Sequence, residues 1–455
     1  MIDLKEAART ILTRLSKERV RFLTLQFVDI LGNVRSRLFP AEDARSLLEE
    51  GYGFDGSSIA GFVEIERSDL VAKPDPNTYC ILPWTSGSKK SGRMTCDVYW
   101  PDSRPFDGDP RFILKRAQQE CEEMGYTAIF GPEVEFSLFK ESDRKPIDFA
   151  RYMDYLPYDL AEDLKMELFF ALRQLGLRPS VAHHEIGPGQ NEINIECCEP
   201  LDCADKVVAF KQAVKILAGR NGMIGTFMAK PLFGYGAHGA HVHVSLRKLH
   251  SSRNLFFDEK SSDHLSDTAR FFVGGLLAHA KALSAVVSPT VNSYKRLVPG
   301  LEAPVYLTWG WANRSVLVKV PSYFPENPGA ARIEFRGPDS SYNPYIAFAA
   351  ILKAGLDGVR NKIDPGPPTS ENVYRLSKER IQELKISSLP RSLGAAIDEL
   401  RKDVVVQEAL GEHSYRRYVE LKEREYKEYL AEIERTGDPG PNISDWELNR
   451  YLISS

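Results

Sequence analysis

The fold is decided by a stretch that reads TAIFGPEVEFSLF, residues 127–139. Polar and apolar residues alternate in its second half, which predicts a strand with Glu133 and Glu135 on one face. The same period of two residues returns at 241–243, which reads HVH, and at 332–336, which reads RIEFR. A lone charge on a strand usually faces solvent, but several alternating sets of carboxylate, imidazole and guanidinium are not explained that way. We therefore expect these strands to contribute to one polar site.

The size and charge of the chain favour an ordinary globular protein. It has 455 residues, of which 43% are hydrophobic and 27% are charged. These values are typical of a soluble protein with a large core and two domains. The net charge is -4, and no basic stripe occurs, so we expect no nucleic-acid partner.

The cysteines and the apolar stretches indicate a cytoplasmic protein. The six cysteines include no CxxC pair, and a chain this long needs no disulfide framework, so we expect a reducing compartment. The N-terminus lacks the hydrophobic region of a signal peptide. The most apolar run, 271–287, contains His279 and Lys281, and we interpret it as too short and too polar to span a membrane.

The order of expected elements predicts an α+β fold with a largely antiparallel sheet. Helices are expected at 3–17, 111–124, 158–175, 204–222, 264–287 and 343–361, with a charged helical tail at 407–451. Strands are expected at 20–28, 34–38, 127–139, 189–196, 240–246, 305–320 and 331–336, and a long loop at 51–61. The proline-rich segment 101–110 is typical of a linker, so we predict domains at 1–103 and 104–455.

Six side chains in these segments match the needs of a divalent-metal site. Mg²⁺ and Mn²⁺ prefer carboxylate oxygens, and imidazole can complete a Mn²⁺ shell. Two neighbouring metals that keep some water or substrate ligands need about five or six protein ligands. The candidates are Glu133, Glu135, Glu185, Glu192, His241 and Glu334. The alternative, that each set forms a structural ion pair, explains one cluster as well as a metal does but explains the joint set less well.

Arginines beside these clusters point to phosphoryl transfer. Arg296, Arg314, Arg332 and Arg336 offer planar forks that suit carboxylates and phosphates. Sites of phosphoryl transfer combine metal ligands with guanidinium groups that bind the phosphate oxygens. The run GYGAHG at 234–239 fits a dinucleotide fingerprint, but it leads into a strand pattern rather than a helix, so we interpret it as a substrate loop.

Seven short motifs follow one another along the chain. They read GFDGSS at 53–58, EVEF at 133–136, GQNE at 189–192, KPLFG at 230–234, NSYKRLVPG at 292–300, NRS at 313–315 and RIEFR at 332–336. In these motifs the chain resembles the class I glutamine synthetases, and the resemblance covers nearly all 455 residues. It implies a small N-terminal β-grasp domain, then a large glutamine-synthetase-type catalytic domain whose curved antiparallel sheet is flanked by helices. It also implies a homododecamer of two hexameric rings, with active sites between neighbouring subunits.

The resemblance also implies a role for each candidate residue. Glu135, Glu185 and Glu192 match the ligands of one metal, and Glu133, His241 and Glu334 those of a second, with Mg²⁺ or Mn²⁺ as the metal. Arg296, Arg336 and the loop around Gly239 match the glutamate site. Arg314 and Lys319 match the phosphate side, and His243, Ser245 and Arg332 match the ATP site. Asp55 from a neighbouring subunit and Tyr152 match the ammonium pocket, and Glu302 matches the flap residue that takes a proton from ammonium.

The implied activity is ATP-dependent ligation of ammonia to L-glutamate through a γ-glutamyl phosphate. The sequence departs from the usual family pattern in three places. The loop 236–241 reads GAHGAH, the run 309–311 reads WGW in place of a more polar one, and Lys319 replaces a usual arginine, which keeps the charge but loses the fork. The loop and the Trp-rich run keep an organic-amine alternative open. The alternatives are a γ-glutamyl ligase that uses an organic amine, and a non-catalytic regulatory paralogue. The presence of all six metal-ligand candidates argues against the paralogue, and Asp55, Tyr152 and Glu302 favour ammonium.

Overall fold

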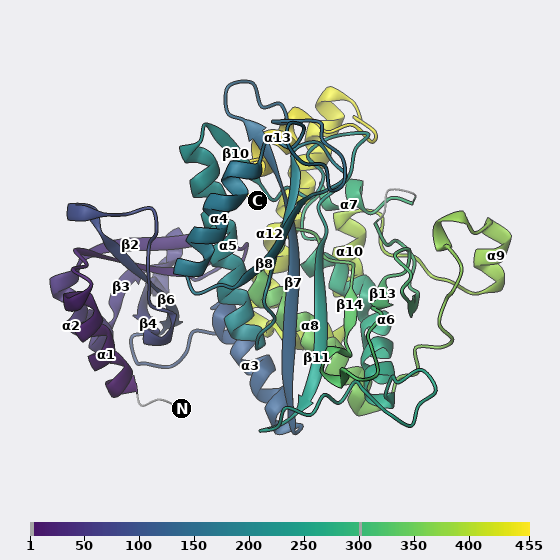
Figure 1. Ribbon diagram of the computed structural model, residues 1–455, viewed down its shortest axis with the longest axis horizontal. Coiled ribbons are helices and arrows are strands. Elements are labelled where there is room, and N and C mark those ends of the chain that lie inside the picture. The colour runs from purple at the N-terminus through teal and green to yellow at the C-terminus, as the bar shows by residue number, and fades with distance from the viewer. Residues whose placement is uncertain (1–3, 300–302) are drawn as a thin grey trace.

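The computed structural model describes residues 4–299 and 303–455, which form two β-sheets with helices around them (Figure 1). The α+β class expected from the sequence is confirmed. Glu302 lies outside the described residues, so the structure says nothing of its position.

The N-terminal sheet has six strands in the order β2-β1-β6-β4-β3, with β5 paired to β6. Its strands are β1 (Phe22–Val28), β2 (Val34–Pro40), β3 (Tyr52–Asp55), β4 (Asp69–Pro74), β5 (Cys80–Ile81) and β6 (Ser91–Tyr99). The helices α1 (Leu4–Lys17) and α2 (Ala44–Glu50) belong to this part of the chain. β1 and β6 run parallel at the centre, and the other pairs are antiparallel. The loop expected at 51–61 is wrong at its start, because 52–55 pairs with β4 as a strand.

The second sheet has eight strands in the order β12-β13-β14-β11-β7-β9-β8, with β10 paired to β7. They are β7 (Tyr126–Lys140), β8 (Pro179–His184), β9 (Gln190–Ile195), β10 (Met223–Thr226), β11 (Ala240–Lys248), β12 (Trp309–Trp311), β13 (Val318–Val320) and β14 (Ile333–Phe335). Only β12 and β13 pair in parallel among these strands. The prediction of a single strand over 305–320 is therefore wrong, since this segment contains two short strands, β12 and β13. β8 and β10 were not expected.

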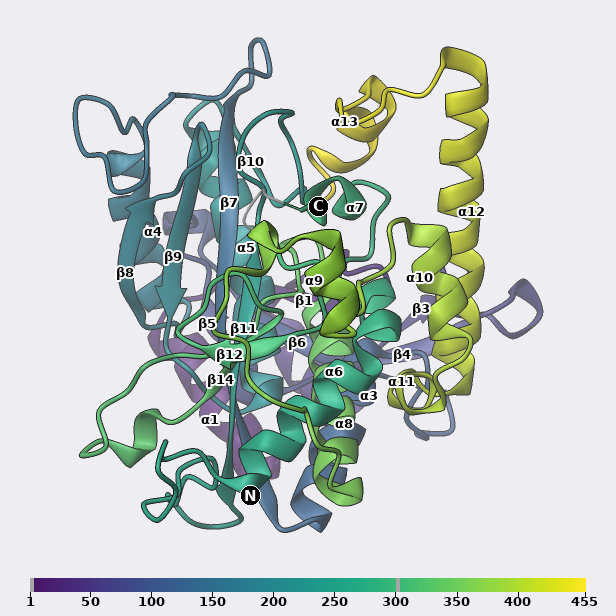
Figure 2. The ribbon, with the colours of Figure 1, turned by 90° about the vertical axis from the view of Figure 1, so that its right-hand side faces the viewer.

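Helices flank this sheet, and the C-terminal part of the chain is helical as predicted (Figures 1 and 2). The helices of this part of the chain are α3 (Pro110–Glu123), α4 (Glu162–Gln174), α5 (Pro200–Arg220), α6 (Asp267–Val287), α7 (Ser293–Arg296), α8 (Pro344–Asn361), α9 (Lys378–Glu383), α10 (Leu393–Leu400), α11 (Val404–Leu410), α12 (Glu412–Thr436) and α13 (Asp445–Tyr451).

Helix α6 is a core helix. It has 21 residues and is long and apolar enough to cross a membrane by length and composition. The prediction that 271–287 is too short and too polar to span a membrane is therefore wrong on these two criteria. However, 67% of its most apolar window is buried inside the protein. It packs on α8 at Gly275, where an added Cβ would lie 2.1 Å from the carbonyl oxygen of Ala354. Glycine is therefore needed for the close approach of the two helices.

One buried arginine joins the two sheets. Arg111, in the first turn of α3, has a side chain only 4% exposed. Its guanidinium donates to Asp75 (2.8 Å) and Asp97 (2.6 Å) from the N-terminal part, and to Asp205 on α5 (2.9 and 3.1 Å). A buried charge with this many partners is costly to disturb, because removing it leaves the partners without compensation.

We expect the substitution Arg111→Met to destabilise the protein by about 3–5 kcal/mol, because the partly buried carboxylates of Asp75 and Asp205 would lose their cation and Asp97 would keep only Lys115. Guanidinium-induced unfolding, followed by circular dichroism, measures the change. The matched control is Arg104→Met, which removes an exposed arginine paired with Asp102 and should shift the midpoint little. Equal shifts in the two variants would contradict the structural role of Arg111.

Candidate active site

The register of three strands brings the acidic and imidazole side chains together. In the pairing of β7 with β11, Glu133 lies opposite His241. In the pairing of β7 with β9, Glu135 lies opposite Glu192, and in that of β11 with β14, His243 lies opposite Glu334. Side chains two residues apart on a strand share a face, so all these groups converge on one side of the sheet.

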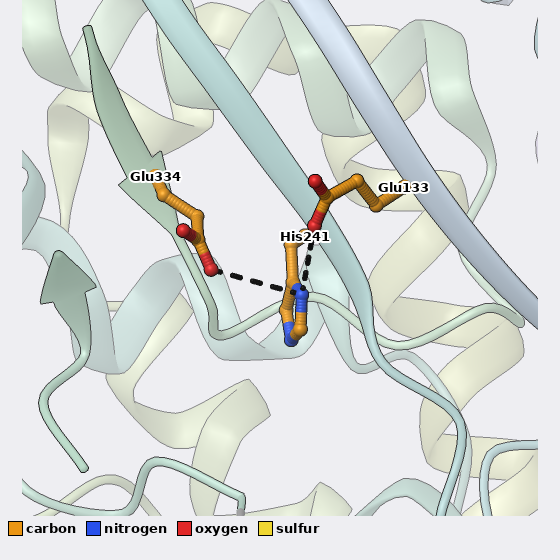
Figure 3. Close-up of side chains that lie close together, drawn as sticks. All are labelled: Glu133, His241 and Glu334. Carbon is orange, nitrogen blue, oxygen red and sulfur yellow. Dashed lines mark hydrogen bonds and ion pairs between the residues drawn. The ribbon is translucent and has the colours of Figure 1, made fainter. Parts of the chain in front are cut away.

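The first group consists of Glu133, His241 and Glu334. One ligand atom of each lies within 4.8 Å of the others. His241 Nδ1 is 3.3 Å from Glu133 Oε2 and 3.8 Å from Glu334 Oε1, and Figure 3 shows the two carboxylates pointing at the imidazole. Burial, and then Arg336, lower the pKa of His241 to about 4. The imidazole is therefore neutral at pH 7, which is the form that binds a metal.

The second group consists of three buried carboxylates, Glu135, Glu185 and Glu192, whose ligand atoms also lie within 4.8 Å of one another. Burial and the charge of Glu185 raise the pKa of Glu135 to about 8. Burial and the charge of Glu135 raise the pKa of Glu192 to about 9. Like charges this close disfavour ionisation unless a cation lies between them. The set therefore fits a divalent cation such as Mg²⁺ or Mn²⁺.

A tight turn presents Glu185 to this second group. The turn between β8 and β9 is closed by hydrogen bonds from Glu185 N to Gln190 O (2.8 Å) and from Gln190 N to Gly187 O (3.0 Å). Gly189 has a φ of 60°, and an added Cβ would lie 2.5 Å from the carbonyl oxygen of Leu138. Only glycine meets both conditions without strain.

Cations surround Glu334 in the first group. Lys319 Nζ lies 2.6 Å from Glu334 Oε2, and Arg336 donates to Glu334 Oε1. Although burial alone would raise the pKa of Glu334, His241 and then Arg336 hold it down at about 2. The carboxylate is therefore ionised at pH 7, and Lys319, the residue that departs from the usual arginine, points its charge at Glu334.

Arginines line the cavity next to the second group. Arg296, Arg314 and Arg336 share it with Glu135, Glu185 and Gly239. Arg296 is buried, and it donates to the carbonyl oxygens of Gly337 (2.8 Å) and Arg336 (3.1 Å). A guanidinium has five N–H donors, so Arg296 keeps donors for a ligand. The cavity can thus bind an anion beside the acidic group.

A chain of contacts extends along β11 from the first group. His243 Nε2 lies 2.9 Å from Glu133 Oε1, and Arg332 Nε donates to His243 Nδ1 over 3.2 Å. Ser245 follows on the same face of β11 and is buried. These three residues form a row that leads away from the six ligand candidates.

Asp55 and Tyr152, which the sequence predicts for the acceptor pocket, come from different parts of the fold. Asp55 lies at the end of β3 in the N-terminal sheet, and Figures 1 and 2 place β3 away from β7 and β11. Its carboxylate accepts from Ser57 N (2.9 Å), Ser57 Oγ (2.6 Å) and Ser58 Oγ (3.0 Å). Tyr152 is 47% exposed, and its ring lies 5.4 Å from that of His183.

Sequence reasoning missed two sets of supporting residues. Gln190 donates to Glu135 Oε2 over 2.7 Å, and its position two residues before Glu192 would have placed it on the same face. His184 and Asp148 form a buried pair (3.0 Å), and Asp148 also accepts from Gly189 N (3.0 Å). This pair ties the turn that carries Glu185 to a distant part of the chain. No local sequence signal could have found it.

A third group of possible metal ligands, Asp148, Asp159 and His184, has its own partners. Lys165 Nζ lies 2.5 Å from Asp159 Oδ2, and Ala161 N donates to Asp159 Oδ1. His184 Nδ1 lies 2.6 Å from the carbonyl oxygen of Glu185. The lysine and the hydrogen bonds already compensate these charges, so we interpret the group as structural support.

Comparisons with known proteins agree along nearly the whole chain. A family model described as the glutamine synthetase catalytic domain matches residues 107–451, and one described as the glutamine synthetase β-grasp domain matches residues 19–101. The glutamine synthetase of Thermotoga maritima is 44% identical over 448 residues, which cover 97% of this chain and 99% of the relative. That of Pyrococcus furiosus is 46% identical over 440 residues, which cover 96% and 97%. A solved structure described as a GmaS/ADP complex has a TM-score of 0.84 at 32% identity and covers 99% of this chain and 100% of its own.

We expect Glu135→Gln and His241→Ala each to weaken Mn²⁺ binding, but at different sites, because the two residues belong to different groups of ligand candidates. Calorimetric titration of the metal-free protein with Mn²⁺ measures affinity and stoichiometry. The matched control is Glu196→Gln, which changes an exposed glutamate near the end of β9 and should leave both values unchanged. Unchanged stoichiometry and affinity in both site variants would exclude the two-metal arrangement.

We also expect Mn²⁺ binding to strengthen as the pH rises. The pKa values of Glu135 (about 8) and Glu192 (about 9) lie above the ordinary value of 4.5. The protonated carboxyls therefore stabilise the metal-free fold fully below about pH 4.5, and this stabilisation is lost as the pH rises through about 8 to 9. A metal must displace the same protons.

Titrations at about pH 7, repeated in buffers of different ionisation enthalpy, measure the proton release. Glu192→Gln should release fewer protons than the unsubstituted protein. An affinity that does not change with pH, together with no dependence on the buffer, would show that these carboxyls are already ionised in the metal-free protein.

Proposed function

Because the chain belongs to the glutamine synthetase family and is a ligase, we propose that it joins ammonia to the side-chain carboxylate of L-glutamate. ATP would be the co-substrate, and the products would be L-glutamine, ADP and phosphate. The observation that carries this proposal is the pair of three-residue groups at Glu133 and Glu135 of β7. They occur in a chain that glutamine synthetases match over 96–97% of its length.

The two groups would hold divalent metals. Glu135, Glu185 and Glu192 would bind one, and Glu133, His241 and Glu334 the other, with Mg²⁺ or Mn²⁺ as the hard cation that suits oxygen ligands. When bound, such ions neutralise charge on transferring phosphoryl groups. Gln190 and Gly239 N, which both donate to Glu135 Oε2, would keep that carboxylate aimed at its metal.

The arginines would place the two anionic substrates. The spare donors of Arg296, together with Arg336, would bind the carboxylates of glutamate, and Arg314 would bind the phosphoryl group during its transfer. All three line one cavity with Glu135 and Glu185. His243, Ser245 and Arg332 would line the ATP side, and Lys319 would act through its ion pair with Glu334. The similar fold of the GmaS/ADP complex supports a nucleotide site in this architecture.

Activation of glutamate by phosphorylation answers a chemical problem. A carboxylate is a poor acyl donor, whereas a γ-glutamyl phosphate has phosphate as its leaving group. The attacking nitrogen must be neutral ammonia, so ammonium must first lose a proton to a general base. We assign that role to Glu302, and the attraction of the cation to Asp55 and Tyr152.

We further propose that Asp55 acts on the site of a neighbouring copy. In its own chain it lies in a different sheet from the six ligand candidates, and the Ser57 and Ser58 hydrogen bonds hold its exposed carboxylate in one orientation. A dodecamer of two hexameric rings, with sites between subunits, would bring the two parts together. The six free cysteines are consistent with a cytoplasmic location.

The altered loop 236–241 keeps Gly239 next to Glu135. His238 turns into the core, where its ring lies 2.7 Å from Ser137 Oγ. Gly239 stays beside the site through backbone contacts: its N–H donates to Glu135 Oε2 (2.8 Å), and its carbonyl accepts from Ser340 Oγ (3.0 Å). The side chain of His238 is therefore buried inside the protein, away from the cavity that Gly239 lines.

A phosphate-release assay distinguishes the three functions. Purified protein is incubated with ATP, glutamate and Mg²⁺ or Mn²⁺, and the acceptor is ammonium, methylamine, ethanolamine or putrescine. We expect kcat/KM for ammonium to exceed that for each amine by at least about tenfold, roughly 1.4 kcal/mol of transition-state discrimination. Equal or better efficiency with an amine would establish the amine-ligase alternative. No release with any acceptor would establish the non-catalytic paralogue.

A further inference from the structure

A cavity of about 500 Å³ lies where α5, the β1–β2 turn, α12 and the C-terminal residues meet. Its lining contains none of the residues assigned above to metals, glutamate, ATP or the acceptor.

 It is therefore a separate feature of the molecule. These segments lie far apart in the sequence, and α5 supplies two of the charged residues that line the cavity.

Two lysines of α5, Lys211 and Lys215, point into this cavity from positions one helical turn apart. Lys211 Nζ donates to the carbonyl oxygen of Tyr342 (3.0 Å), and Lys215 Nζ donates to that of Ile453 (3.0 Å). Within residues 4–299 and 303–455, neither ammonium group forms an ion pair with a carboxylate. Backbone carbonyls thus supply hydrogen bonds but no compensating charge.

The other cations that line the cavity each have a carboxylate partner. Arg35 pairs with Asp29 (2.8 Å), Lys422 with Glu425 (3.0 Å), and Arg450 with Glu428 (2.6 Å). Ser455 also lines the cavity, but no ion pair in the described part of the chain joins its carboxylate to either lysine. The shortage of negative charge is therefore confined to Lys211 and Lys215.

Burial makes this shortage costly. It lowers the pKa of Lys211 to about 7, with a smaller contribution from the charge of Lys215, and it lowers the pKa of Lys215 to about 8. Asp339 acts in the opposite direction on Lys211. Both lysines are only partly buried, but an ammonium group that leaves water without a carboxylate partner still loses stability, and like charges one turn apart repel each other. A bound anion would remove both penalties.

We propose that this cavity binds a small dianion, a phosphate or a dicarboxylate, between the ammonium groups of Lys211 and Lys215. Lysine binds phosphate as a point charge and binds carboxylates in the same way, so the two lysines fit either chemistry. The volume is within the range of small-molecule sites.

Binding to the metal-free protein tests the proposal, with inorganic phosphate in one titration and malonate in the other. The double variant Lys211→Met/Lys215→Met keeps the length of both side chains and removes both charges. We expect its affinity for the preferred anion to fall at least about tenfold, as expected for lost hydrogen bonds to charged groups. The matched control is Lys206→Met, because Lys206 lies on the same helix, pairs with Asp202 and does not line the cavity.

The arm with the tighter binding identifies the anion. Absence of binding by either anion, or equal affinity in the double variant and the unsubstituted protein, would overturn the proposal. Phosphate bound near the arginines of the proposed active site would be unchanged in the double variant, so the comparison between proteins separates the two locations.

Acetylation of the unsubstituted protein gives a second, site-resolved measurement that does not depend on the folding of a variant. Mass spectrometry follows the acetylation rates of individual lysines with and without the anion. We expect the anion to slow the reaction at Lys211 and Lys215 several-fold and to leave Lys206 unchanged. Equal rates with and without the anion at Lys211 and Lys215 would overturn the proposal.

Discussion

The pairing of β7 with β9 and β11 is the constraint on which the site depends. It sets Glu133 opposite His241 and Glu135 opposite Glu192. Because side chains alternate between the two faces of a strand, a shift of one residue would turn one member of each pair to the other face. The buried apolar residues between them, such as Val134 and Phe136, face the core and oppose such a shift. The core of the catalytic part therefore holds the acidic groups in place.

The two groups on β7 solve the problem of buried charge in different ways. Around Glu334, Lys319 and Arg336 compensate the carboxylate within the protein, and its pKa is held at about 2. At Glu135, burial and the charge of Glu185 outweigh the opposing charges of Arg296 and Arg336, and at Glu192 burial and Glu135 act in the same direction, so both pKa values are raised instead. The second group must gain a cation before its carboxylates ionise at neutral pH. Metal binding and proton release are therefore linked more strongly at Glu135 and Glu192 than at Glu334.

Alternation in the sequence was sufficient to predict the strands that carry the site, because a period of two residues is a local property. The same-face placement of Glu133 with Glu135, and of His241 with His243, followed directly from it. β3 and β8 could not be predicted in this way, since Gly53 and the mixed sequence of 179–184 give no clear alternation. The pair of His184 with Asp148 joins residues 36 positions apart and depends on tertiary packing. Local patterns carry no information about such a contact.

Of the parts of the proposed site, the acceptor pocket is the one to which a single copy of the chain contributes the fewest residues near the metal-ligand candidates. The metal-ligand candidates and the arginines converge within one sheet and its loops, whereas Asp55 lies in the other sheet, on a rigid turn fixed by Ser57 and Ser58. A preorganised carboxylate of this kind loses little entropy when it meets a ligand, so it suits the binding of a small cation. If it meets that ligand in a neighbouring copy, the selectivity for ammonium depends on how closely two subunits fit. Substitutions at the subunit contact would then change the choice of acceptor without touching a metal ligand, and assembly and acceptor selectivity would be one physical property of the protein.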